Sequence, residues 1–287
     1  IYEGYPNVLI NTIAMNTPVV SFDCPGGPNE IITHGVNGLL VKYLDVNDLK
    51  NKISFLLQNK FDYKPISRKE VDGKRKYLTP DGHAVASVTT ILDATKDKTH
   101  LIAWRKRVGE QKAREITTEA AGVGTRMHKY LEDYVEFGEW PTPGSNPFAK
   151  KAHRMAEVIR DEAMVHVDNI WGSEVQLYVP QLYAGTTDLV GTFKGNPAIM
   201  DFKQTNKPKK QEWVVDYYLQ MVAYAEAHNA VFGTDIREGH VFMCSRGDDS
   251  MILGGETYQQ FDLWPHEYDE WKHEWYERVY AYYEKHG

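Results

Sequence analysis

The feature that most constrains this chain is a change of pattern near residue 60, because the two sides of that point require different folds. Before it, apolar helical runs alternate with short β-rich runs such as Thr17–Asp23 and Leu39–Val41. Such alternation is typical of a doubly wound α/β domain, of which this length supplies only a part. We therefore predict two units, a partial Rossmann-like segment over residues 1–60 and a separate domain over residues 61–287.

The composition excludes several classes of protein. A hydrophobic content of 42% and a charged content of 25% are ordinary for a globular chain, and no apolar run is long enough to span a membrane. Two cysteines, Cys24 and Cys244, are too few for a disulfide framework or a four-cysteine zinc or iron–sulfur site. A net charge of −7 argues against a protein that coats nucleic acid, but it is compatible with an enzyme that has a local basic patch.

The chemistry concentrates in a predicted β-hairpin over residues 186–203. Two apolar, β-rich runs flank a turn, which we expect to be centred on Gly195-Asn196. That register sets Asp188 opposite Lys203 and diagonal to Asp201. Since Asp201 and Lys203 are two residues apart, they share one face of their strand. The pattern therefore predicts two carboxylates and one ammonium group at one end of the hairpin.

Two interpretations of this hairpin stay open. Hard divalent cations such as Mg²⁺ bind carboxylate oxygens, and a bound ion polarises a phosphoryl oxygen and lowers the pKa of water. A nearby lysine can orient that water or stabilise charge that develops on the phosphate. The same residue types also form ordinary ion pairs at sheet edges, which stabilise a fold only weakly.

Other polar residues occur in a suggestive order around the hairpin. Glu174 lies in the preceding predicted strand, and His128 lies in a helix that we expect to begin at Gly122-Val123-Gly124. Gln220 and Tyr224 are four residues apart on the helix that follows, so they project from one face of it. Each of these residues is also compatible with a packing role, so their order along the chain is the specific signal.

Basic and aromatic residues provide candidates for substrate binding. Cations beside exposed rings suit a single strand, because charge neutralises phosphates and rings stack on bases. Alternatively, the rings pack against the sheet and the cations are solvated. The candidate nucleic-acid-binding residues are Lys207, Lys209, Lys210, Trp213, Arg105 and Arg107.

The first 60 residues resemble the donor-binding domain of retaining glycosyltransferases with two Rossmann-like domains. The matching strings are Glu3–Asn7, Thr17–Val20, Gly26–Ile32 and Gly35–Val41. In that family two glutamates eight positions apart face the nucleotide sugar. Glu3 matches the first of them, but Asn11 stands at the position of the second. The resemblance therefore predicts a remnant that lacks transferase activity.

Residues 61–287 resemble the RecB-like branch of the PD-(D/E)XK nuclease superfamily, which includes phage and mitochondrial genome-maintenance exonucleases. The matching motifs are Ser87–Leu92, Gly124-x-x-x-His128, Glu174, Gly185–Asp188, Asp201-Phe202-Lys203 and Gln220-x-x-x-Tyr224. The resemblance implies an α/β fold with a restriction-endonuclease-like mixed sheet and flanking helices. It also implies an exonuclease that depends on Mg²⁺ or Mn²⁺ and acts on DNA ends or single strands.

The same resemblance implies a role for each site residue. Asp188, Asp201, His128 and, by the loosest match, Glu174 hold the metal; Lys203 is the catalytic lysine; Gln220 and Tyr224 position the DNA. The alternatives are an inactive relative that binds nucleic acid, or a sugar-nucleotide-binding remnant of a glycosyltransferase. The expected setting is the cytoplasm of a bacterium or phage-infected host, and the oligomeric state stays open.

Overall fold

The computed structural model describes the chain except residues 1–5, 16, 18, 35–36, 59–60, 72–73, 247–254 and 287. It divides into two compact units, residues 1–62 and residues 63–287. Among the helices of the described residues, none has both the length and the apolar character that a membrane span requires.

The first unit is a small α/β segment. Strands β1 (Val20–Phe22) and β2 (Leu39–Val41) pair in parallel, and their helices are α1 (Asn7–Ala14), α2 (Pro28–Ile31) and α3 (Val46–Gln58). Its buried apolar side chains include Val19, Ile32, Leu39 and Val41. These few residues make a small core, as expected for two strands and three helices.

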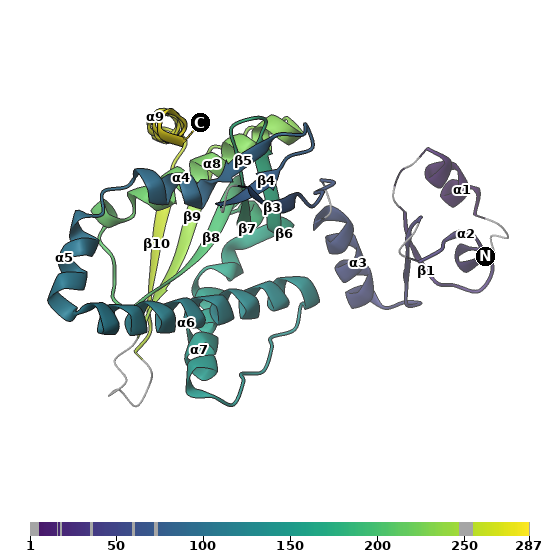
Figure 1. Cartoon of the computed structure of the whole chain (residues 1–287). Helices are drawn as coiled ribbons and strands as arrows, with labels where there is room; N and C mark the ends of the chain where they lie inside the picture. The colour runs from purple at the N-terminus through teal and green to yellow at the C-terminus, as the bar shows by residue number, and fades with distance from the viewer. Residues whose placement is uncertain are drawn as a thin grey trace. The chain divides into compact units, whose positions relative to one another are not determined.

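The second unit contains an eight-stranded mixed sheet with the order β10-β9-β8-β7-β5-β4-β3, while β6 pairs with the other edge of β7 (Figure 1). The pairs β5–β7 and β8–β9 are parallel and the others are antiparallel. The strands are β3 (Ser67–Val71), β4 (Lys74–Leu78), β5 (Ala84–Ser87), β6 (Val167–Val179), β7 (Tyr183–Phe193), β8 (Asn196–Thr205), β9 (Glu238–Ser245) and β10 (Thr257–Leu263). This arrangement confirms the predicted mixed α/β class.

Helices cover both faces of this sheet (Figure 1). On one side, α6 (Glu110–Phe137) and α7 (Pro147–Glu162) share an apolar core with β7, β8 and β9. On the other side lie α8 (Val215–Phe232), α4 (Val88–Thr95) and α9 (Tyr268–His286). Helix α8 is buried along most of its length, which explains its nearly continuous apolar sequence. Helix α5 (Thr99–Val108) and two short 3₁₀ turns, Met164–His166 and Gln211–Trp213, complete the connections.

The helix boundaries follow local capping chemistry, with one correction. Ser87 caps α4, because its Oγ accepts a hydrogen bond from the backbone N–H of Thr90 at 3.0 Å. The predicted helix start at Gly122-Val123-Gly124 is wrong, since α6 is continuous through these residues. The break falls at Gly109, whose φ of 84° favours glycine. The buried stripe of α6 outweighs the roughly 1 kcal/mol cost of an interior glycine.

The hairpin forms, but its register differs from the expected one. Leu189 and Met200 form the last pair of the two strands, so Asp188 comes level with Asp201 instead of with Lys203. The turn consists of Lys194 and Gly195, both at positive φ, as a two-residue hairpin requires. A shift of two residues leaves the same side chains on each face, whereas a shift of one would have exchanged them. Strands β5 and β10 are absent from the sequence prediction.

Candidate active site

The sheet opens between β7 and β8. Their pairing ends at Leu189 and Met200, and β5 joins the same edge of β7 only at Tyr183 and Ala184. Within the described chain, residues 185–188 of β7 therefore have no strand beside them on that edge. Asp188 and Asp201 follow the last paired residues, so both lie at this opening.

Two groups hold the carboxylate of Asp188 in place. Its Oδ2 accepts a hydrogen bond from the backbone N–H of Phe202 at 2.7 Å, which replaces a strand-to-strand bond. The same oxygen lies 3.4 Å from Nδ1 of His128 on α6, whose ring packs edge-on against Phe202. Burial opposes ionisation of Asp188, but His128 and Lys203 outweigh it and hold its pKa below the ordinary value. Asp188 therefore stays a carboxylate.

Glu174 reaches the same point from β6. Ser173 pairs with Leu189 and Val175 with Thr187, so Glu174 comes level with Asp188. Glu174 has a φ of 50°, a left-handed conformation that costs a non-glycine residue on the order of 1–3 kcal/mol. The residue as a whole is exposed at the rim, but its carboxyl group is partly buried. This desolvation, together with the charge of Asp188, raises the pKa of Glu174 to about 7. Strain of this kind is typical of functional positions.

Three potential metal ligands meet here. One ligand atom from each of His128, Glu174 and Asp188 lies within 4.8 Å of the others. They come from α6, β6 and β7. The structure thus brings together three of the four residues predicted as metal ligands.

Asp201, the fourth, lies deeper. It is 2% exposed and forms an ion pair with Lys203. Its other oxygen accepts a hydrogen bond from Nε2 of Gln220 at 3.1 Å. Burial and the charge of Asp188 raise the pKa of Asp201 to about 6, although Lys203 opposes this shift. A cation beside Asp201 therefore favours its ionised form.

Lys203 supplies that cation. Its side chain is 20% exposed, and its Nζ lies 5.4 Å from the centre of the Tyr217 ring. Burial lowers the pKa of Lys203, but Asp201 and Asp188 outweigh it and raise that pKa above the ordinary value. The ammonium group therefore stays protonated in a partly desolvated setting.

Gln220 and Tyr224 form the wall behind Asp201. They are 9% and 2% exposed, so neither offers a surface to a large substrate. Besides Asp201, the amide of Gln220 lies 3.5 Å from the Tyr224 hydroxyl, to which it donates. A side chain at Gly185 would come within 2.7 Å of the Tyr224 ring, so the glycine makes room for it. Gln220 contacts Asp201 directly, and Tyr224 is joined to Asp201 only through Gln220.

The residues predicted to bind nucleic acid lie mainly on the surface. Lys207, Lys210 and Trp213 are exposed beyond β8; Trp213 is 57% exposed, and Nζ of Lys210 lies 5.4 Å from its ring centre. The backbone of Lys209 exchanges two hydrogen bonds with the side chain of Gln259, which anchors this segment to β10. Arg105 and Arg107 are exposed on α5, and neither forms an ion pair with a described residue.

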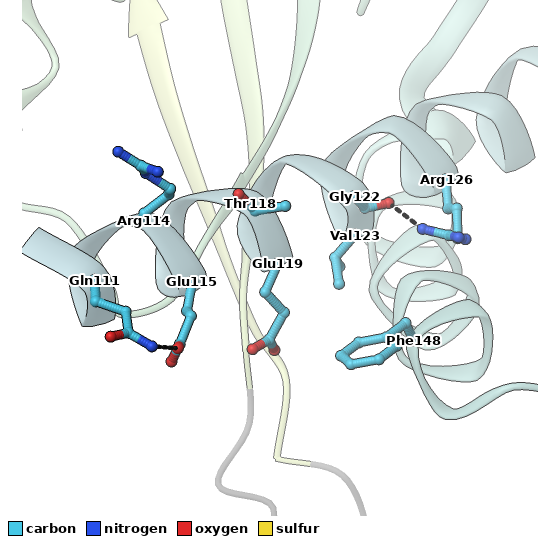
Figure 2. Close-up of a pocket in the computed structure, with 9 residues that line it drawn as sticks. All are labelled: Gln111, Arg114, Glu115, Thr118, Glu119, Gly122, Val123, Arg126 and Phe148. Atoms are coloured by element: carbon cyan, nitrogen blue, oxygen red, sulfur yellow. Dashed lines mark hydrogen bonds between the residues drawn. The ribbon is translucent and has the colours of Figure 1, made fainter.

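A groove along α6 is separate from this site. It has a volume of about 580 Å³, and charges of both signs lie at its edge (Figure 2). Its lining residues are Gln111, Arg114, Glu115, Thr118, Glu119, Gly122, Val123, Arg126 and Phe148. None of the four predicted metal ligands lines it, and Figure 2 shows Arg114 extending away from Glu115 and Glu119.

Sequence reasoning missed the residues that border the site from β3 and β4. The guanidinium of Arg68 donates to Oγ1 of Thr186 at 3.0 Å, and the hydroxyl of Tyr77 lies 3.3 Å from the same oxygen. Thr186 precedes Asp188 by two residues. No local pattern relates residue 68 to residue 186, because the contact depends on how β4 and β5 add to the sheet.

Comparison with known proteins separates the two units. Residues 1–59 match the family described as glycosyl transferases group 1. An exopolysaccharide phosphotransferase of Streptomyces coelicolor is 36% identical over 75 residues, which is 26% of this chain and 8% of that protein. A poly(ribitol-phosphate) α-N-acetylglucosaminyltransferase of Staphylococcus aureus is 36% identical over 58 residues, 20% of this chain and 12% of that protein. The chain thus spans a small part of these relatives, and the match supports the predicted resemblance of the first segment.

A solved structure is similar to part of the chain. It is a protein of Eubacterium rectale, assigned provisionally as an exonuclease, with a TM-score of 0.37 and 14% identity. The similarity covers 56% of this chain and 63% of that one. Because the TM-score and the identity are this low, the similarity supports no statement about function. Any functional assignment rests on the geometry of the candidate active site.

Proposed function

We propose that residues 63–287 hydrolyse phosphodiester bonds of DNA with the help of a divalent metal ion. The observation that carries this proposal is the approach of His128, Glu174 and Asp188 within 4.8 Å, beside the Asp201–Lys203 pair. Two carboxylates and one imidazole form a donor set that suits Mn²⁺ and Mg²⁺, with Asp201 as a further oxygen ligand. When bound, the ion would polarise a phosphoryl oxygen and lower the pKa of a water molecule.

The protein residues contribute positioning and charge. Asp188 is fixed by the N–H of Phe202, and Asp201 by the amide of Gln220, so both carboxylates need little reorganisation. The Lys203 ammonium stabilises negative charge on the phosphate as the attacking oxygen adds to it. Because Lys203 is mostly buried, this interaction is stronger than it would be in water.

The finer assignment, an exonuclease that acts on ends or single strands, is supported by the sequence resemblance and by the surface beyond β8. Exposed Lys207 and Lys210 can neutralise phosphates, and the exposed Trp213 ring can stack on a base. These residues follow β8, the β-strand that carries Asp201 and Lys203. A DNA strand bound to them would therefore reach the candidate active site.

The test is cleavage of end-labelled single- and double-stranded DNA with Mg²⁺, with Mn²⁺ and with a chelator, using Asp188→Asn as the inactive control. We expect products only with metal, and mononucleotides in preference to internal fragments. Folded protein that yields no product with either ion would refute the proposal. An inactive nucleic-acid-binding relative would bind the same DNA without cleaving it.

A second candidate function belongs to the first unit. Its family match at residues 1–59 favours binding of a sugar nucleotide. Glu3, the matching acid, lies outside the described residues, and Asn11 on α1 replaces the second acid. Titration calorimetry with UDP- and GDP-sugars tests this candidate, and absence of heat with both would exclude it.

A further inference from the structure

In the described part of the chain, three arginine guanidinium groups stack on aromatic rings. They are Arg68 over Tyr77, Arg160 over Trp140 and Arg237 over Tyr268, at 4.9, 4.3 and 5.1 Å from the ring centres. Arg160 is neutralised by Asp161 at 2.7 Å. Arg237 is neutralised by Asp269, also at 2.7 Å. Arg68 differs from both, because no described carboxylate pairs with it and its hydrogen-bond partner is the neutral hydroxyl of Thr186.

Arg68 is therefore oriented but not neutralised. A guanidinium has five N–H donors, and the bond to Thr186 uses one of them. The ring of Tyr77 and the hydroxyl of Thr186 hold the group in place, while the residue is exposed to solvent. Fixing an arginine in advance reduces the entropy lost on binding an anion, and its planar fork fits phosphate oxygens.

The rest of the β3–β4 hairpin adds positive charge. Lys69 pairs directly with Lys76 across the two strands, and neither forms an ion pair with a described residue. Like charges in facing positions destabilise a hairpin. A bound anion near the hairpin would offset this repulsion, which nothing in the described fold compensates.

The hairpin lies close to the candidate active site. Thr186, which orients Arg68, is two residues before Asp188 on β7, a separation of about 7 Å along a strand. A phosphate held by Arg68 would thus belong to the same nucleic-acid strand as the phosphate at the metal ligands.

We infer that Arg68, oriented by Tyr77 and Thr186, binds a backbone phosphate of DNA next to the one that is cleaved, with Lys69 and Lys76 strengthening the positive field. The identification of DNA as the ligand rests on the proposed function. Because the contact is to phosphate, it is independent of base sequence.

The test compares Arg68→Gln with Arg237→Gln, a control that also removes an arginine stacked on tyrosine. Binding of fluorescent 20-nucleotide single-stranded DNA, one oligo-dT and one of mixed sequence, is measured over a range of salt in chelator without metal. Arg68→Gln should weaken binding of both about tenfold or more and reduce the salt slope by about 0.7, the value for one phosphate contact. Arg237→Gln should change neither quantity.

Four results would each overturn the inference. They are equal effects of the two variants, an unchanged salt slope, a loss of affinity limited to one base sequence, and no DNA binding by the unsubstituted protein. If Arg68→Gln does not fold, Thr186→Val is tested instead, because it keeps the charge of Arg68 and removes the hydroxyl that orients it. This variant should bind DNA more weakly, and binding as tight as that of the unsubstituted protein would overturn the inference. Cleavage is assayed separately with Mg²⁺ and Mn²⁺. Binding that depends on Arg68 without any cleavage would refute the proposed function, and of this inference it would leave only the binding of a DNA phosphate by Arg68.

Discussion

Replacement of Lys203 by alanine is expected to slow single-turnover cleavage of DNA by about 10²–10³-fold while DNA binding stays close to normal. The ammonium group contacts Asp201, has a side chain only 20% exposed and lies 5.4 Å from the Tyr217 ring centre. It is therefore placed and desolvated before substrate arrives. A positioned charge of this kind contributes about 3–4 kcal/mol to the transition state, which corresponds to that loss of rate.

The substitution also has a structural cost, which must be measured separately. Asp201, 2% exposed, would lose its cation, and the loss of a buried partner costs up to about 3–5 kcal/mol. The pKa of Asp201 is already about 6, so protonation can relieve part of this cost in mildly acidic solution. The loss of thermal stability in the variant should accordingly be smaller below pH 6 than near pH 7.5, in metal-free protein.

Single-turnover rates at saturating Mg²⁺ test the catalytic role of Lys203, with Lys272→Ala as the matched control. Lys272 pairs with the largely buried Glu226 at 2.8 Å, and neither is a candidate site residue, so its removal tests for a general effect of breaking such a pair. The control should cleave at the parental rate. If Lys203→Ala cleaves within a few-fold of the parent, the catalytic role of Lys203 is refuted.

Three further predictions follow from the same geometry. Asp188→Asn should abolish Mn²⁺ binding and cleavage together, as measured by calorimetry and product gels, and Mn²⁺ binding at parental affinity would contradict its role as a ligand. Gly185→Ala should lower the free energy of unfolding by about 1–3 kcal/mol, because the added carbon would lie 2.7 Å from the Tyr224 ring; an unchanged urea midpoint would exclude this clash. The metal-free protein should melt at a higher temperature near pH 5.5 than near pH 7.5. The reason is that the pKa values of Asp201 and Glu174 are raised, to about 6 and about 7. The folded chain therefore binds these protons more tightly than the unfolded chain does. Saturating Mg²⁺ should reverse this trend, since its ligands bind it deprotonated, and the same pH dependence with and without Mg²⁺ would argue against metal at these carboxylates.

Much of the secondary structure follows from local sequence. The hairpin of β7 and β8 agrees with the prediction, because apolar β-rich runs and a turn signal act within a few residues. The α6 boundary does not, since two interior glycines suggest a helix start that packing overrides. The short strand β5 escapes prediction because its partner β7 is distant in sequence.

The sequence by itself determined the change of fold near residue 60, the hairpin over residues 186–203 and the placement of Asp201 and Lys203 on one face of their strand, since a separation of two residues along a strand is local geometry. Tertiary structure alone decided the hairpin register, the opening between β7 and β8, and the approach of His128 and Glu174 to Asp188. These last contacts join a helix layer and two strands, whose relative positions depend on how the apolar faces pack together. No spacing along the chain encodes that packing.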